Sequence, residues 1–205
     1  MSKPYAIGIA GYMGAGKSTC TRYLADALAP DVEVIDADVE AKRLMLSDPA
    51  IIKALADAFG TSVMNNNVLN FAELGALSFA NVQNLYRLNS IVHPKVIAFI
   101  EQRLFDSRHK YCICDAALIP QWKIERRFDM CIWVSSAREI RYNRLAAKIR
   151  LPEMLLRKRM EFQETIMEEP GLLPWHIIAN NGADPGLFTG QLAELLEQIR
   201  LENHG

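Results

Sequence analysis

Short apolar runs alternate along the chain with longer segments whose apolar residues recur at helical spacing. After the first apolar run, at residues 5–10, the segment 19–28 carries Tyr23, Leu24, Ala27 and Leu28 on one helical face. Runs of this length bounded by polar residues are typical of buried strands, and five occur, at 5–10, 32–36, 110–114, 129–134 and 175–179. This rhythm predicts an α/β fold with a parallel sheet of about five strands and helices on both faces.

Residues 49–107 depart from this rhythm, because they contain several helical patterns and no convincing strand. The longest helical pattern runs from about Asn81 to Ser107. We therefore expect an all-helical insertion that holds a substrate. His93-Pro94 interrupts the long pattern, and proline is favoured at the first position of a helix. The sequence predicts a new helix there, with His93 in a structural or substrate-positioning role.

Residues 138–159 form a strongly basic segment, with eight basic and two acidic side chains and a net charge of +6. Arg138, Arg141 and Arg144 recur every three residues and would share one helix face. A solvated basic face and a nucleic-acid site are alternatives, but nucleic-acid binding lacks an interleaved aromatic platform. We expect instead a lid over residues 138–168 that closes on a polyphosphate.

The glycine-rich stretch "GYMGAGKST" (residues 11–19) follows the first predicted strand directly. Gly11, four residues and then Gly16-Lys17-Ser18 match the Walker A pattern, in which backbone N–H groups cradle phosphates at a helix N-terminus. The alternative is a flexible turn before a capped helix, which leaves the position of Lys17 unexplained. The motif predicts a phosphate site, with Lys17 on the β- and γ-phosphates and Ser18 on Mg²⁺. The loop residues expected to bind nucleotide are Gly11, Met13, Gly14, Ala15, Gly16, Lys17, Ser18 and Thr19.

Three aspartates follow predicted strands, where ligands of parallel sheets bind. Asp36 ends the second strand and Asp38 is expected to cap the next helix. Both could be caps only, or one could orient an acceptor hydroxyl and take its proton during phosphoryl transfer. Asp115 ends the run "YCICD", where an aspartate could hold Mg²⁺ through water.

Composition narrows the class of protein. Of 205 residues, half are hydrophobic and 23% are charged, and the net charge is −1. These values exclude disorder and give no global attraction to nucleic acid or to a membrane. No apolar stretch has the length of a membrane span, and the N-terminus lacks a signal-peptide layout. The four cysteines are predicted to be buried reduced thiols, with a metal site as the alternative. A cytoplasmic enzyme is expected, while oligomeric state is not predicted.

Together these motifs resemble the dephospho-coenzyme A kinase family, from residue 5 to about residue 200. The resemblance rests on "GYMGAGKST", "VIDADVEAKRL", "AFG" at 58–60, "LNSIVHP" at 88–94, "RMEFQ" at 159–163 and "NNG" at 180–182. It implies a P-loop kinase with a nucleotide-binding core (1–48, 108–137 and 169–205), an acceptor-binding insertion (49–107) and the basic lid.

The resemblance also implies a reaction in which the ATP γ-phosphate passes to the ribose 3′-hydroxyl of dephospho-CoA, giving coenzyme A. Asp38 would be the base, and Arg144 and Lys148 would act from the lid. Asn180 and Gly182 would lie near adenine. Asp36, Asp38 and His93 would lie on the side of the acceptor.

Several positions depart from the family pattern: Tyr12 in the loop, Ala117 and Gln121 after the third strand, Lys148 in the lid, and Pro174-Trp175 before the last strand. Lysine cannot form the planar fork that arginine offers to phosphate. The departures concern the acceptor and the lid more than the ATP loop.

Two rival functions share parts of this pattern. A P-loop kinase of another small-molecule or nucleotide acceptor would carry the same ATP-side residues. A GTP-dependent switch or a non-catalytic nucleotide-binding regulatory protein is the second rival. The sequence has no asparagine-lysine-x-aspartate element for guanine, and it retains Lys17 and the acidic pair, which favours a kinase.

Overall fold

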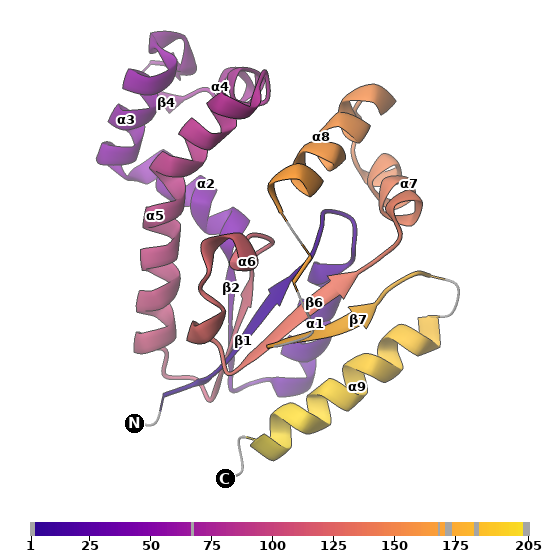
Figure 1. The fold of residues 1–205 in the computed structure, drawn as a ribbon. Helices are drawn as coiled ribbons and strands as arrows, with labels where there is room; N and C mark the ends of the chain where they lie inside the picture. Colours follow the sequence, from indigo (N-terminus) through magenta and orange to yellow (C-terminus); the bar gives the residue numbers. More distant parts are fainter. Residues whose placement is uncertain (1–2, 67, 168, 171–173, 183–184, 203–205) are drawn as a thin grey trace. The chain divides into compact units, whose positions relative to one another are not determined.

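The computed structural model describes residues 3–66, 68–167, 169–170, 174–182 and 185–202. The chain forms two compact units (Figure 1). The first comprises residues up to Ile35 and from Leu104 onward, and the second spans Asp36–Arg103. The second unit is the counterpart of the insertion expected at 49–107.

A five-stranded sheet forms the centre of the first unit (Figure 1). Its order is β2-β5-β1-β6-β7, and β1 pairs in parallel with β5 and β6, as does β6 with β7. All five predicted strands are confirmed to within one residue: β1 Tyr5–Ala10, β2 Val32–Asp36, β5 Tyr111–Asp115, β6 Met130–Ser135 and β7 Trp175–Ala179. Because β1 is central and wholly buried, its apolar run needs no polar alternation.

Helices α1 (Lys17–Leu28) and α9 (Pro185–Glu202) cover one face of this sheet. Their apolar side chains, among them Leu24 and Leu192, share a core with Ile7 and Ile9 of β1. On the opposite face, the short helix α6 (Ile119–Trp122) packs close to β1. There a Cβ on Gly8 would lie 2.9 Å from the ring of Phe128 and 3.2 Å from Ile119. Phe128 follows the short 3-10 turn η2 (Glu125–Arg127).

The basic segment folds as two helices between β6 and β7: α7 (Arg138–Lys148) and α8 (Glu153–Ile166). Leu145 of α7 packs with Leu156 and Met160 of α8 in a small core of their own. Arg141 is only 4% exposed, so the face that it shares with Arg138 is not uniformly solvated.

The second unit is mainly helical, but it also contains a short hairpin. Its elements are α2 (Ala37–Ser47), α3 (Pro49–Phe59), the 3-10 turn η1 (Thr61–Val63), β3 (Met64–Asn65), β4 (Val68–Leu69), α4 (Phe71–Ser78) and α5 (Val82–Asp106), which runs past the end of the unit. The expectation that 49–107 contains no strand is therefore wrong. Antiparallel β3 and β4 have two residues each, too few to produce an alternating pattern in the sequence.

The expectation of a new helix at Pro94 is also wrong, because α5 is one helix with Pro94 inside it. A proline in a helix interior typically costs about 3 kcal/mol. Val92, Val96 and Ile100 are buried at four-residue intervals around it, and this packing favours a continuous helix.

All four cysteines are buried free thiols, as predicted. Burial raises the pKa of Cys20 and of Cys131 to about 12, so neither thiol ionises near neutral pH. Among the described residues, no group of three or more His, Cys, Asp or Glu side chains is arranged to hold a metal ion. Within the same part of the chain, no helix combines the length and apolar character that crossing a bilayer requires.

Candidate functional site

The stretch Gly11–Thr19 turns the chain from β1 into α1 with the geometry of a phosphate loop. Gly14 and Gly16 have φ angles of 77° and 109°, in the range that favours glycine. Gly16 is the N-cap of α1 and has no side chain with which to satisfy the helix N–H groups. The first turn, which begins at Lys17, therefore presents its N–H groups and the positive end of the helix dipole to an anion.

Four segments from distant parts of the sequence meet at the carboxyl ends of the strands. The phosphate loop follows β1, Asp115 ends β5, Ser136 follows β6 and Asn180 follows β7. Because parallel strands end at the same edge of the sheet, this is where an α/β fold binds its ligand. The order of the strands thus collects residues that are up to 165 positions apart.

Arg144 of α7 and Asn180 are attached directly to the phosphate loop. Asn180 Nδ2 donates to the carbonyl of Ala15 at 2.8 Å, and Asn180 Oδ1 accepts from Arg144 Nη2 at 2.9 Å. Arg144 Nη1 lies 3.3 Å from the same Ala15 carbonyl and 3.3 Å from Ser136 Oγ. A Cβ on Gly16 would lie 2.1 Å from Asn180 Nδ2, so only glycine fits under this side chain.

A cavity of about 540 Å³ opens beside this arrangement. Its lining combines the phosphate loop, α7, the segment after β7 and α9: Gly14, Gly16, Lys17, Ser18, Thr19, Arg144, Leu145, Lys148, Asn180, Gly182, Phe188 and Thr189. Three of these side chains are cationic and none is acidic, a charge pattern that suits a polyphosphate. A larger open hollow of about 670 Å³ is bordered by residues of α8 alone and contains no loop residue, so it has no comparable chemistry.

Gly11 and Met13, both predicted to bind nucleotide, are not among the described residues that line the cavity. Gly11 is buried, and a Cβ on it would lie 2.4 Å from the carbonyl of Val134 on β6. The N–H of Met13 donates to Gln163 Oε1 of α8 at 2.7 Å. The backbone N–H of Met13 is therefore already occupied by a side chain from α8.

Ser18 and Asp115 are the predicted metal ligands. Ser18 is exposed in the first turn of α1. Asp115 Oδ2 accepts a hydrogen bond from the hydroxyl of Thr21 at 3.0 Å, one helical turn beyond Ser18. The Ser18 hydroxyl and the Asp115 carboxylate are hard oxygen donors of the kind that Mg²⁺ prefers.

Asp36, Asp38 and His93 belong to the second unit. The expectation that Asp38 caps a helix is wrong, because Asp36 is the cap of α2 and its Oδ1 accepts from the N–H groups of Asp38 and Val39, each at 3.0 Å. The Asp38 carboxylate is exposed and has no hydrogen-bond partner in the described part of the chain. Burial lowers the pKa of His93 to about 4, so its imidazole is uncharged at neutral pH.

Sequence reasoning assigned no individual role to three residues of α7 and α8 that connect to the loop: Gln163, Arg141 and Glu164. Gln163 belongs to the motif "RMEFQ", which signalled the family without indicating what the glutamine contacts. Arg141 was expected on the basic face of a lid, with a solvated face as the alternative, yet it is buried and paired with Glu164 of α8. No periodicity could have revealed this pairing, because it depends on how α7 and α8 pack.

The departures from the family pattern that follow β5 lie near the carboxyl end of the sheet, whereas Trp175 lies at the amino end of β7. Gln121 of α6 has a buried side-chain oxygen with no hydrogen-bond partner among the described residues. Ala117 is in the turn between β5 and α6. Trp175, which begins β7, packs edge-on against Trp133 of β6 with ring centroids 6.2 Å apart.

Comparison with known families matches residues 5–184 to the model of the dephospho-CoA kinase family. A dephospho-CoA kinase of Chlorobium chlorochromatii is 30% identical, over 97% of this chain and 97% of the relative. One from Deinococcus radiodurans is also 30% identical, over 97% and 94% of the two chains.

Solved structures share the fold at lower identity. A Thermus thermophilus protein superposes with a TM-score of 0.74 at 24% identity, covering 98% of both chains. A dephospho-CoA kinase from Campylobacter jejuni gives 0.60 at 19%, covering 97% of this chain and 98% of the other. A gluconokinase from Sinorhizobium meliloti gives 0.54 at 16%, covering 98% and 99%. At these identities the likeness demonstrates the P-loop kinase fold alone.

Proposed function

The chain belongs to the dephospho-CoA kinase family, and from this premise we propose that it transfers the γ-phosphoryl group of ATP to the ribose 3′-hydroxyl of dephospho-CoA, giving coenzyme A and ADP. The observation that carries the proposal is the cationic cavity at the N-terminus of α1. Lys17, Arg144 and Lys148 line it, and none of the described lining residues is acidic, so it suits the triphosphate of ATP. We expect the reaction to take place in the cytoplasm.

On the ATP side, the chain supplies positioning and positive charge. Lys17 would reach the β- and γ-phosphates, while backbone N–H groups of the loop hold the remaining oxygens. Arg144 and Lys148 would place further positive charge near the phosphoryl group that is transferred. In the transition state this group carries negative charge spread over its oxygens. Asn180 and Gly182 would border the adenine. Preorganised donors of this kind are typically the largest single contribution to catalysis.

Ser18 and Asp115 offer oxygen donors that would suit Mg²⁺. Ser18 would bind the ion directly, and the Asp115 carboxylate, held by Thr21, would bind it through water. A Mg²⁺ ion shared with substrate phosphates needs only one or two protein carboxylates, so a cluster of three acidic residues is not required. When bound, the ion neutralises charge on the phosphate oxygens.

On the acceptor side, Asp38 would act as the base. The 3′-hydroxyl oxygen forms a bond to the γ-phosphorus as the bond from that phosphorus to the β–γ bridging oxygen breaks. The hydroxyl proton passes to Asp38, and ADP leaves with the bridging oxygen. Asp36 accepts two backbone N–H groups as the cap of α2, which supports a positioning role for it. His93 would contact the acceptor as a neutral imidazole.

An acceptor panel tests the proposal. ADP release would be measured with ATP and Mg²⁺ on dephospho-CoA, adenosine, AMP, gluconate and shikimate, with the mass of each product checked. Turnover should be highest with dephospho-CoA, and adenosine should be far poorer because binding energy from the remote pantetheine arm is used in the transition state. Lys17→Ala is the control and should lower turnover by about 10²–10³-fold. Turnover of AMP with a silent dephospho-CoA would assign the chain to the rival class of small-molecule kinases.

A further inference from the structure

The outer half of the phosphate loop, Tyr12–Gly14, is held by the two helices that were expected to form a mobile lid. Tyr12 Oη donates to the carbonyl of Met167, just past α8, at 3.1 Å. The N–H of Met13 donates to Gln163 of α8 at 2.7 Å. A Cβ on Gly14 would lie 2.7 Å from the Arg141 carbonyl of α7. Both helices therefore contact the loop backbone or its side chains.

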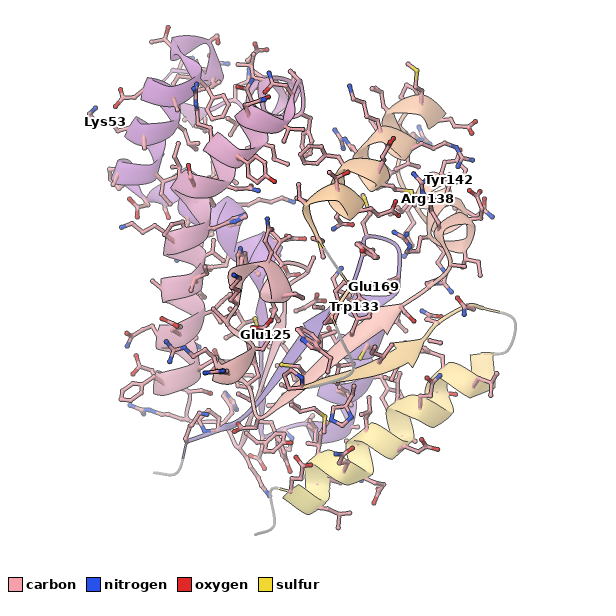
Figure 2. All side chains as sticks on the ribbon, viewed as in Figure 1. Lys53, Glu125, Trp133, Arg138, Tyr142 and Glu169 are labelled. Atoms are coloured by element: carbon pink, nitrogen blue, oxygen red, sulfur yellow. The ribbon has the colours of Figure 1, made fainter. Side chains whose placement is uncertain are left out.

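Arg141 stands at the centre of these contacts. Its guanidinium lies 4.8 Å from the centroid of the Tyr12 ring, its Nε donates to the Ser136 carbonyl at 3.1 Å, and its Nη2 forms an ion pair with Glu164 of α8. The Tyr12 ring also meets Trp133 edge-on, with centroids 5.2 Å apart. Figure 2 labels Trp133, which belongs to β6. The loop tyrosine is thus held between the sheet and a cation.

A buried cation is costly unless its partners are well placed, so its position requires a reason. The side chain of Arg141 is 5% exposed, and its Nη1 has no hydrogen-bond partner within the described ranges. Arg138, on the same face of α7, reaches the same carboxylate from a side chain that is 49% exposed. Joining α7 to α8 therefore does not require a buried arginine.

We propose that Arg141 is a positioning residue for the reaction. Through the Tyr12 ring it fixes the phosphate loop in its ATP-binding conformation, and through Glu164 it makes that conformation depend on α8. This inference rests on the proposed function, because ATP is the ligand that the loop is positioned to hold. Arg141 acts through Tyr12 and has no required contact with the reacting atoms.

The chain provides a matched control in a second arginine–tyrosine contact between α7 and α8. Arg157 lies 3.9 Å from the ring centroid of Tyr142 and pairs with Glu153 and Glu139. It makes the same kinds of contact as Arg141, but its side chain is 40% exposed and these three partners all lie on α7 and α8. Figure 2 shows Tyr142 on α7. Removing Arg157 weakens helix packing without altering the Tyr12 contact.

The experiment compares Arg141→Met with Arg157→Met by titration calorimetry. A non-hydrolysable ATP analogue with Mg²⁺ is titrated into each variant without acceptor, well below its melting temperature. We expect Arg141→Met to raise the Kd about tenfold, the usual scale of coupling within one contact network, and Arg157→Met to leave it within about twofold. In turnover assays Arg141→Met should raise the KM for ATP, while kcat at saturating ATP changes much less.

Two further variants separate positioning from a merely structural role. Arg141→Lys keeps the charge near Glu164 but loses the planar group that stacks on Tyr12, so its Kd should be intermediate. Tyr12→Leu should make the effect of Arg141→Met on the logarithm of Kd smaller than it is in the wild-type background. If Arg141→Met does not fold, Tyr12→Leu and Glu164→Gln each remove one of its contacts and should themselves weaken binding of the analogue.

Equal Kd values for Arg141→Met and Arg157→Met, with similar losses of melting temperature, would overturn the proposal. Strict additivity with Tyr12→Leu would do the same. Failure of every acceptor in the turnover panel would count against the proposed function and leave the binding comparison intact. The two proposals therefore fail in distinguishable ways.

Discussion

Replacing Gly16 by alanine tests the geometry of the phosphate loop directly. Gly16 has a φ angle of 109°, and a Cβ there would lie 2.1 Å from Asn180 Nδ2. Asn180 bonds the Ala15 carbonyl and accepts from Arg144. Alanine must therefore strain the backbone, displace Asn180, or move the loop.

The free-energy cost of this substitution can be calculated from the backbone strain and the hydrogen bonds that it would disturb. A left-handed backbone costs an L-residue about 1–2 kcal/mol. The charge-assisted bond to Arg144 contributes about 1.5–3 kcal/mol and the bond to Ala15 about 0.5–1.5 kcal/mol. Because the loop lies at the surface, we expect it to move in the free variant. Rebuilding the binding conformation should then weaken ATP affinity by about 3 kcal/mol, which is on the order of 10²-fold.

Calorimetric titration of the ATP analogue measures this cost, and Gly60→Ala is the matched control. Gly60 also has a positive φ, of 86°, but a Cβ on it would meet no atom within 4 Å. Gly60→Ala should lower the melting temperature and leave the Kd within about twofold, since it adds only backbone strain. In an Asn180→Ala background, the penalty of Gly16→Ala should shrink. An undiminished penalty there, or wild-type affinity in Gly16→Ala itself, would refute the reasoning.

Three further predictions follow from the acceptor side and the lid. Asp38→Asn should lower turnover by about 10²–10⁴-fold with little change in ATP affinity, whereas Asp36→Asn keeps an oxygen for the helix cap and should have a small effect; the opposite ranking would exchange their roles. Because burial lowers the pKa of His93 from 6.5 to about 4, its neutral form stabilises the fold above pH 6.5, and this contribution is lost as the pH falls toward 4. At about 1.36 kcal/mol per pKa unit, and reduced for partial exposure, this loss of unfolding free energy is ~2 kcal/mol. The unfolding free energy of His93→Gln, measured in urea, should therefore depend less on pH in this window than that of the wild type. An equal pH dependence of the two proteins would contradict the prediction. Hydrogen exchange in residues 138–159 should slow when ATP and acceptor are both bound, and protection confined to the phosphate loop would rule out a closing lid.

Local sequence patterns were sufficient to predict the strands of the sheet and the phosphate loop. Three of the five strands, including β1, have the bounds that their apolar runs predict. They could be predicted because each buried strand is a short apolar run between polar residues. The helix α5 shows where such patterns fail. Pro94 predicts an interruption from its own chemistry, but the buried residues on either side of it keep the helix intact.

The sequence by itself determined the strands, the phosphate loop and the family, since each depends on residues that are close together in the chain. Only the tertiary structure decided what surrounds the loop. Asn180 reaches Ala15 because β7 lies beside β6 and β6 beside β1, and Arg141 meets Tyr12 because α7 begins where β6 ends. The sequence of the basic segment is compatible with arginines that face water and with arginines that stack on a tyrosine ring. Burial is a property of the packed chain, and it made Arg141 a part of the site and left Arg157 on the surface.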